Sequence, residues 1–179
     1  MPTFVALLRG INVGKAKRVA MAELRALLSE LGYSKVSTLL NSGNAVFNAD
    51  TGTPEKLAHD ISNAISSRLS LDVPVIVKSL QEPTDIVAGN SLTFEEQDFS
   101  RLMVAFTQDP GTLAGLVAIE PLVVAPEQFL IGRNAAYLHC ASGILESKAA
   151  AALLGKIGKA VTTRNWATVL KLMALADAA

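Results

Sequence analysis

The chain has 179 residues, of which 50% are hydrophobic and 18% charged, and its 16 basic side chains balance 16 acidic ones. This composition excludes a disordered chain, and the zero net charge argues against a protein that coats nucleic acid by bulk attraction. The single cysteine, Cys140, cannot form an internal disulfide, and residues 4–8 fall far short of the ~20 apolar residues that cross a bilayer. We therefore expect a globular, cytoplasmic protein with no membrane partner.

Residues 1–80 alternate between strand and helix patterns. Met21, Leu24, Leu28 and Leu31 recur at helical spacing, and Thr53 followed by Pro54 is typical of a helix start. The predicted strands are residues 3–8, 36–40, 45–47 and 73–77. The order β-α-β-β-α-β predicts a ferredoxin-like plait, in which two helices cover one face of a four-stranded antiparallel sheet.

Residues 81–179 form the second predicted domain, a less regular plait-like α+β half with helices at its carboxyl end. We expect the two halves to pack as one compact unit, because no low-complexity linker separates them. The predicted strands are residues 102–107, 122–124, 128–131 and 136–140. The predicted helices are residues 82–88, 110–116, 145–154 and a last helix from about Arg164.

A basic, glycine-containing segment follows the first strand. Residues 9–18 read RGINVGKAKR, and residues 1–81 carry nine basic and six acidic side chains. The spacing fails both requirements of a phosphate-binding P-loop, since only three residues separate its glycines and no Ser or Thr follows Lys15. Backbone N–H groups in such a loop, together with Arg9 and Asn12, still suit an anion. Glycines that serve only as turns explain the segment equally well.

A second polar segment, Asn41-Ser42-Gly43-Asn44, separates two predicted strands. Both Ser42 and Asn44 are able to donate to a ligand oxygen, but turn chemistry alone also explains these residues. In a plait the first and third strands are antiparallel neighbours, which predicts that Arg9 lies near Asn44.

The third segment is Thr162-Thr163-Arg164-Asn165-Trp166. We interpret one of the two threonines as the N-cap of the last helix, with Arg164 and Asn165 in its first turn. A cation such as Arg164 is unfavourable near the positive end of a helix dipole, and an anion bound at that terminus would explain its presence. A buried salt bridge or a contact between domains is an equal alternative for Arg164. Trp166 begins the apolar stripe and is expected in the core.

Nothing in the sequence assigns catalysis. His139 and Cys140 are neighbours in a predicted strand, so their side chains point to opposite faces and form no nucleophile-base pair. No spacing of His, Cys or carboxylates indicates a metal site, and no cofactor is expected. The oligomeric state stays open.

Three motifs together resemble a bacterial family catalogued as domain of unknown function 1697. They are Arg9-Gly10-Ile11-Asn12-Val13-Gly14, Ser42-Gly43-Asn44 and Thr163-Arg164-Asn165-Trp166, in this order. The resemblance implies two ferredoxin-like halves and no established activity.

Our leading hypothesis is a binding protein for a phosphate- or carboxylate-bearing ligand such as a nucleotide or a single-stranded nucleic acid. The expected site residues are Arg9, Asn12, Ser42, Asn44, Arg164 and Asn165. One alternative is an enzyme of unknown substrate, in which Arg9 and Arg164 orient an anion beside Ser42. In another, the three motifs are purely structural.

Overall fold

The computed structural model describes residues 1–92, 95 and 98–179. The chain divides into two compact units. Unit 1 contains Met1–Gln81 and Leu172–Ala179, and unit 2 contains Glu82–Lys171. Each unit holds one four-stranded antiparallel sheet, with strand orders β2-β3-β1-β4 and β6-β7-β5-β8.

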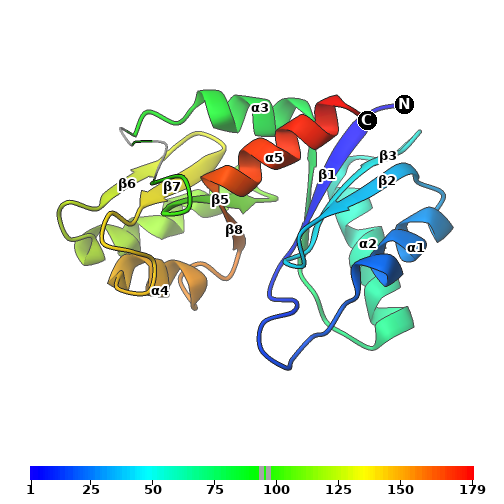
Figure 1. Cartoon of the computed structure of the whole chain (residues 1–179), viewed down its shortest axis with the longest axis horizontal. Helices are drawn as coiled ribbons and strands as arrows, with labels where there is room; N and C mark the ends of the chain where they lie inside the picture. Colours follow the sequence, from blue (N-terminus) through cyan, green and yellow to red (C-terminus); the bar gives the residue numbers. More distant parts are fainter. Residues whose placement is uncertain (93–94, 96–97) are drawn as a thin grey trace. The chain divides into compact units, whose positions relative to one another are not determined.

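The predicted ferredoxin-like plait of the first half is confirmed. Its elements are β1 (Thr3–Leu8), α1 (Met21–Glu30), β2 (Ser34–Leu39), β3 (Asn44–Asn48), α2 (Pro54–Leu69) and β4 (Val75–Ser79). Figure 1 shows α1 and α2 on one face of this sheet. The core lies between them, where alternate strand residues such as Phe4, Ala6 and Phe47 meet the buried faces of both helices. The apolar residues that recur every second position in the strands and about every 3.6 positions in the helices therefore face the same core.

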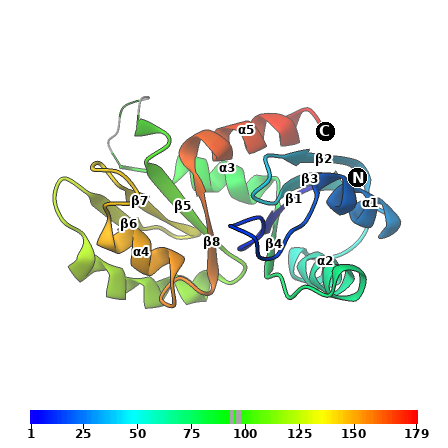
Figure 2. The same cartoon turned by 60° about the horizontal axis from the view of Figure 1, so that its bottom comes forward.

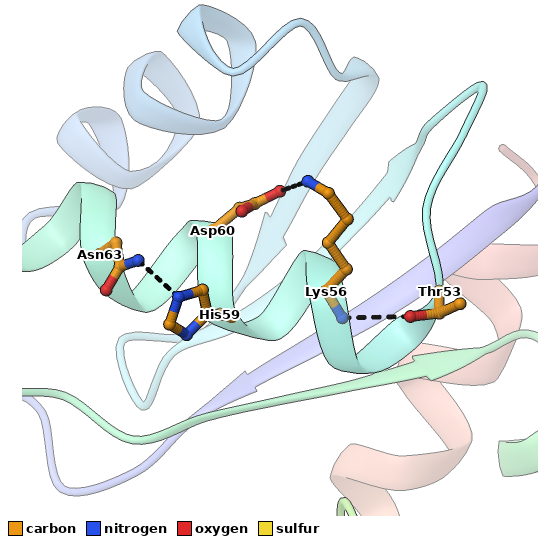
Figure 3. A network of polar contacts seen from close by, with 5 residues as sticks. All are labelled: Thr53, Lys56, His59, Asp60 and Asn63. Carbon is orange, nitrogen blue, oxygen red and sulfur yellow. Dashed lines mark hydrogen bonds and ion pairs between the residues drawn. The ribbon is translucent and has the colours of Figure 1, made fainter.

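The start of α2 agrees with the prediction from its sequence. The Thr53 hydroxyl accepts the Lys56 N–H at 3.3 Å, and Pro54 occupies the first helical turn. Figure 3 shows this cap together with the Lys56–Asp60 ion pair and the contact between His59 and Asn63 further along the helix. All of these polar groups lie outside the apolar face that α2 buries.

Unit 2 repeats the plait topology. Its elements are α3 (Gln81–Ala88), β5 (Leu102–Thr107), η2 (Pro110–Leu122), β6 (Gln128–Ile131), β7 (Ala135–His139), α4 (Lys148–Leu154), β8 (Val161–Asn165) and the start of α5 (Trp166–Asp177). Figure 2 shows η2 and α4 together below the sheet. The Tyr137 hydroxyl donates to the Ile86 carbonyl, which ties α3 to the opposite face. Both halves are thus ferredoxin-like, and the second is irregular because a 3-10 helix replaces its first α-helix.

The predicted strand at residues 122–124 is wrong. The 3-10 helix η2 extends to Leu122, and Leu113, Leu116 and Ile119 are its buried residues. Their spacing of three matches a helix with three residues per turn, which aligns them on one face. The helix predicted for 145–154 begins only at Lys148, because Ser147 caps it by accepting the Ala150 N–H.

The two plaits carry a buried cation at the same register. In unit 1 Lys78 pairs with Val5 of β1, and in unit 2 Arg164 pairs with Val104 of β5. Each cation is the fourth residue of the last strand and faces away from the helices of its own sheet. Lys78 is 2% and Arg164 8% exposed. The repeat is visible in the topology although the sequences of the two halves show no periodicity.

Candidate functional site

The segment after β1 forms a narrow excursion from the sheet. The Arg9 N–H donates to the Pro74 carbonyl at 2.9 Å, which holds the start of the segment beside β4. Val13 and Ala16 then pair as an antiparallel bridge, so that Gly14 and Lys15 form a tight turn. This part of the segment is exposed, and it returns to the protein at the buried Val19.

Asn12 holds the two ends of this segment together. Its side-chain Nδ2 donates to the Val19 carbonyl at 2.8 Å and to the Asn41 carbonyl at 2.7 Å. Its Oδ1 accepts the Val19 N–H at 2.9 Å. Asn12 has φ 55°, a left-handed conformation that Asn tolerates better than most residues. The amide therefore shapes the loop and fastens it to the turn between β2 and β3.

That turn packs tightly against the end of β1. The Leu8 N–H donates to the Gly43 carbonyl at 2.8 Å. A Cβ on Gly43 would lie 2.7 Å from the Leu8 Cβ and 2.9 Å from the Ile11 Cδ1, and Gly43 has φ 91°. Only glycine fits this position without displacing its neighbours.

The predicted proximity of the first and second motifs is confirmed, because Asn44 of β3 stands opposite Leu7 of β1. Asn44 is itself fully buried, and its Nδ2 donates to the Leu39 carbonyl at 2.8 Å and to the Ser42 Oγ at 2.9 Å. This amide supports the turn from inside, and an amide offers no general base to Ser42.

The four cations of the loop have different surroundings. Arg9 is half-buried, and Lys15 is exposed on the turn. Lys17 is tethered by a 2.6 Å hydrogen bond from its Nζ to the Asp72 carbonyl. Arg18 is exposed and lines a pocket.

This pocket has a volume of about 350 Å³ and lies within unit 1. Its lining residues are Asn12, Arg18, Val19, Ala20 and Asn41. Ala20 is the N-cap of α1 and offers no side-chain oxygen to the N–H groups of the first turn. The pocket thus combines a guanidinium, an exposed amide and the open start of a helix.

The expected placement of Arg164 in a helix is wrong. Residues Val161–Asn165 form β8, since Thr162 to Asn165 pair with β5 across the sheet. Arg164 donates from Nη1 to the Thr162 Oγ1 at 2.9 Å and to the Thr163 carbonyl at 2.8 Å. Burial lowers the pKa of Arg164 to about 10 by desolvation, so the guanidinium remains charged near neutral pH. Neither threonine caps α5.

Asn165 caps α5 in place of the threonines, because its Oδ1 accepts the Thr168 N–H at 2.9 Å. Replacing Asn165 with alanine should reduce the free energy of unfolding by about 1 kcal/mol, the ordinary cost of a lost N-cap. Asn165→Asp keeps the acceptor and should stay close to the parent in urea denaturation. Equal losses in both variants would contradict the capping role.

The sequence prediction overlooked two residues of the pocket. It included Arg18 only in the basic segment of residues 9–18 and Asn41 only in the turn segment of residues 41–44, and it named neither as a site residue. A signal for Arg18 was available, since residues 19–21 place no Ser, Thr, Asp or Asn at the start of a predicted helix; no local signal marked Asn41. Of the predicted residues, Arg9, Asn12, Ser42 and Asn44 belong to unit 1, and Arg164 and Asn165 belong to unit 2.

Other chemistry receives no support from the side chains described. Burial raises the pKa of the Cys140 thiol to about 11, which disfavours the reactive thiolate. Within residues 1–92, 95 and 98–179 no group of three or more His, Cys, Asp or Glu side chains is placed to hold a metal ion. No helix in this described part is long and apolar enough to span a membrane.

Comparison with known proteins decides the family. The family described as "Protein of unknown function (DUF1697)" matches residues 1–137. The chain belongs to this DUF1697 family. The structure of this DUF1697 protein is similar to that of the conserved bacterial protein SP0830 from Streptococcus pneumoniae, with a TM-score of 0.80 at 24% identity. The similarity covers 97% of this chain and 98% of the other, and it supports the fold. No curated protein matches the chain.

Proposed function

We propose that this DUF1697 protein binds an anionic ligand, bearing phosphate or carboxylate, in the pocket of unit 1. A nucleotide and a single-stranded nucleic acid are both members of this ligand class. The observation that carries the proposal is the meeting of Arg18 with the start of α1 in one pocket. Unpaired N–H groups and the helix dipole favour negative charge there, and a guanidinium matches phosphate or carboxylate with two parallel hydrogen bonds.

Other helices of the chain supply their own acceptor at this position. Thr53 caps α2, Ser147 caps α4, and the Asp109 carboxylate accepts the Gly111 N–H at the start of η2. The helix η2 follows the first strand of its plait, as α1 does. A ligand anion beside α1 would take the place that a carboxylate of the protein occupies in unit 2.

Local charge also supports an anion in unit 1. Arg9, Lys15 and Lys17 accompany Arg18 in the same loop, and their combined field favours negative ligands over a short range. Glu23, in the first turn of α1, is the nearest acidic residue along the chain, and it contributes to the electrostatic field at Arg68 of α2.

The proposal changes the roles expected for the other residues. Asn12, Asn44 and Asn165 make the hydrogen bonds that shape two loops and cap a helix. We assign ligand contact to Arg18, Asn41 and the first N–H groups of α1, with Arg9 at the margin of the loop. We assign no catalytic step, and we propose the cytoplasm as the compartment because the single, free cysteine forms no internal disulfide.

Replacing Arg18 with alanine tests this function. Loss of a charged hydrogen-bonding partner should weaken binding of inorganic phosphate and of AMP about 10- to 100-fold, measured by isothermal titration at low salt. The matched control is Arg133→Ala, which removes an exposed arginine from unit 2. Neither variant should change the melting temperature of the free protein by much. Parent-like affinity in Arg18→Ala, or no binding of either anion by the parent, would refute the proposal.

A further inference from the structure

The charges in the pocket fit one anionic group. Of the four cations in the loop, Arg18 lines the pocket, while Arg9 is half-buried outside its lining. Lys15 lies on the exposed turn, and the Asp72 carbonyl accepts a hydrogen bond from Lys17. One guanidinium pairs with a single phosphate group in a bidentate manner. A protein that follows a nucleic acid strand instead neutralises several phosphates in succession.

The aromatic residues of unit 1 offer no platform for stacked bases. The three are Phe4, Tyr33 and Phe47, and every residue of this unit is described. Their rings stack on one another, with centroids 5.8 Å apart for Phe4 and Phe47 and 4.6 Å apart for Tyr33 and Phe47. Tyr33 precedes β2 and Asn41 follows it, and a six-residue strand separates them by about 20 Å. Binding of single-stranded nucleic acid normally combines a basic groove with such stacking.

Asn41 adds a neutral polar group to the pocket. Its backbone carbonyl accepts the Asn12 side chain at 2.7 Å, which fixes the position of the residue. Asn41 is an exposed residue and belongs to the lining of the pocket. An amide presents one acceptor and two donors, a set that matches hydroxyl groups. Asn12, Val19 and Ala20 complete the lining.

From this combination we infer that the ligand is a small molecule with one phosphate monoester and several hydroxyl groups, such as a sugar phosphate. Arg18 holds the phosphate, and Asn41 recognises a hydroxyl group of the ligand body. The volume of about 350 Å³ lies at the lower end of the ~300–1,000 Å³ range of small-molecule pockets. The inference rests on the proposed function, since it names the ligand class of the same pocket.

The experiment separates the phosphate from the rest of the ligand. Isothermal titration with inorganic phosphate, glucose 6-phosphate and a twelve-nucleotide oligothymidylate would be carried out on the parent and on the Asn41→Ala variant. Loss of one hydrogen bond should weaken binding of glucose 6-phosphate about tenfold and leave inorganic phosphate unchanged. Asn63→Ala is the matched control, because it removes an exposed amide of α2 in the same unit.

The outcomes distinguish this inference from the proposed function. Oligothymidylate binding more tightly than glucose 6-phosphate, and depending on Arg18, would overturn the small-molecule ligand while keeping the anion site. Equal losses for inorganic phosphate and glucose 6-phosphate in Asn41→Ala would show that Asn41 only shapes the pocket, which also overturns the inference. If the parent binds none of the three probes, the proposed function itself fails.

Discussion

Replacing Gly158 with alanine is expected to destabilise unit 2 by more than about 3 kcal/mol, because the new methyl group has no space. A Cβ at this position would lie 1.7 Å from the Leu153 carbonyl oxygen and 2.7 Å from the carbonyl carbon. These are main-chain atoms near the end of α4, so relief requires movement of the backbone. Gly158 also accepts the Val161 N–H at 3.1 Å, which places the start of β8. The strain therefore reaches both elements.

The single tryptophan gives a direct measurement of this effect. Trp166 is buried in unit 2, and its fluorescence in urea reports unfolding of that unit. The matched control is Gly115→Ala in η2, where an added Cβ meets no atom within 4 Å. Gly115→Ala should keep the midpoint of the parent. A Gly158→Ala midpoint equal to that of the control would show that the α4–β8 turn relaxes without cost.

Replacing Asn12 with alanine is expected to abolish the pocket and to cost about 2–3 kcal/mol. The variant loses the two donations to the Val19 and Asn41 carbonyls and the acceptance of the Val19 N–H. Each such bond contributes about 1 kcal/mol, partly offset by water at this half-buried site. Alanine also adopts φ 55° less readily than asparagine. Released from Asn12, Arg18 and Asn41 no longer converge, so phosphate affinity should fall more than tenfold.

Two measurements separate the backbone effect from the side-chain effect. Asn12→Gly tolerates the left-handed conformation but lacks the amide, so it should recover part of the stability and none of the phosphate binding. Hydrogen exchange at the Val19 amide should accelerate in both variants, since its acceptor is the Asn12 Oδ1. Parent-like phosphate affinity in Asn12→Ala would mean that the loop is held by other contacts.

Local signals in the sequence were sufficient for most of the fold. The apolar run of β5 matched the observed strand, and Thr53 and Pro54 marked the start of α2 as predicted. Capping depends on the residue and its immediate neighbours, which makes such boundaries readable. The β-α-β-β-α-β order also predicted the position of Arg9 near Asn44, because plait topology determines which strand ends meet.

Nonlocal pairing decided the structure of the third motif, which the prediction placed wrongly. The local sequence of residues 162–164 is typical of a helix start, but these residues pair with β5 and form a strand. The N-cap of α5 is therefore Asn165. Pairing of β8 with β5 satisfies several backbone N–H and C=O groups at once. This gain outweighs the local preference of a threonine for an N-cap position. The 3-10 helix η2 was missed for a different reason, since its period of three became evident only from its buried residues.

The amino-acid sequence by itself determined the class of fold, the family motifs and the basic character of the first loop. Only the tertiary structure decided that the Asn12 side chain hydrogen-bonds within the protein, to the carbonyls of Val19 and Asn41. It also decided that Arg18, Ala20 and Asn41 line one pocket. The physical reason is distance along the chain. Asn41 is 29 residues from Asn12 and meets it because β3 pairs with β1, a contact that no local pattern of residues encodes.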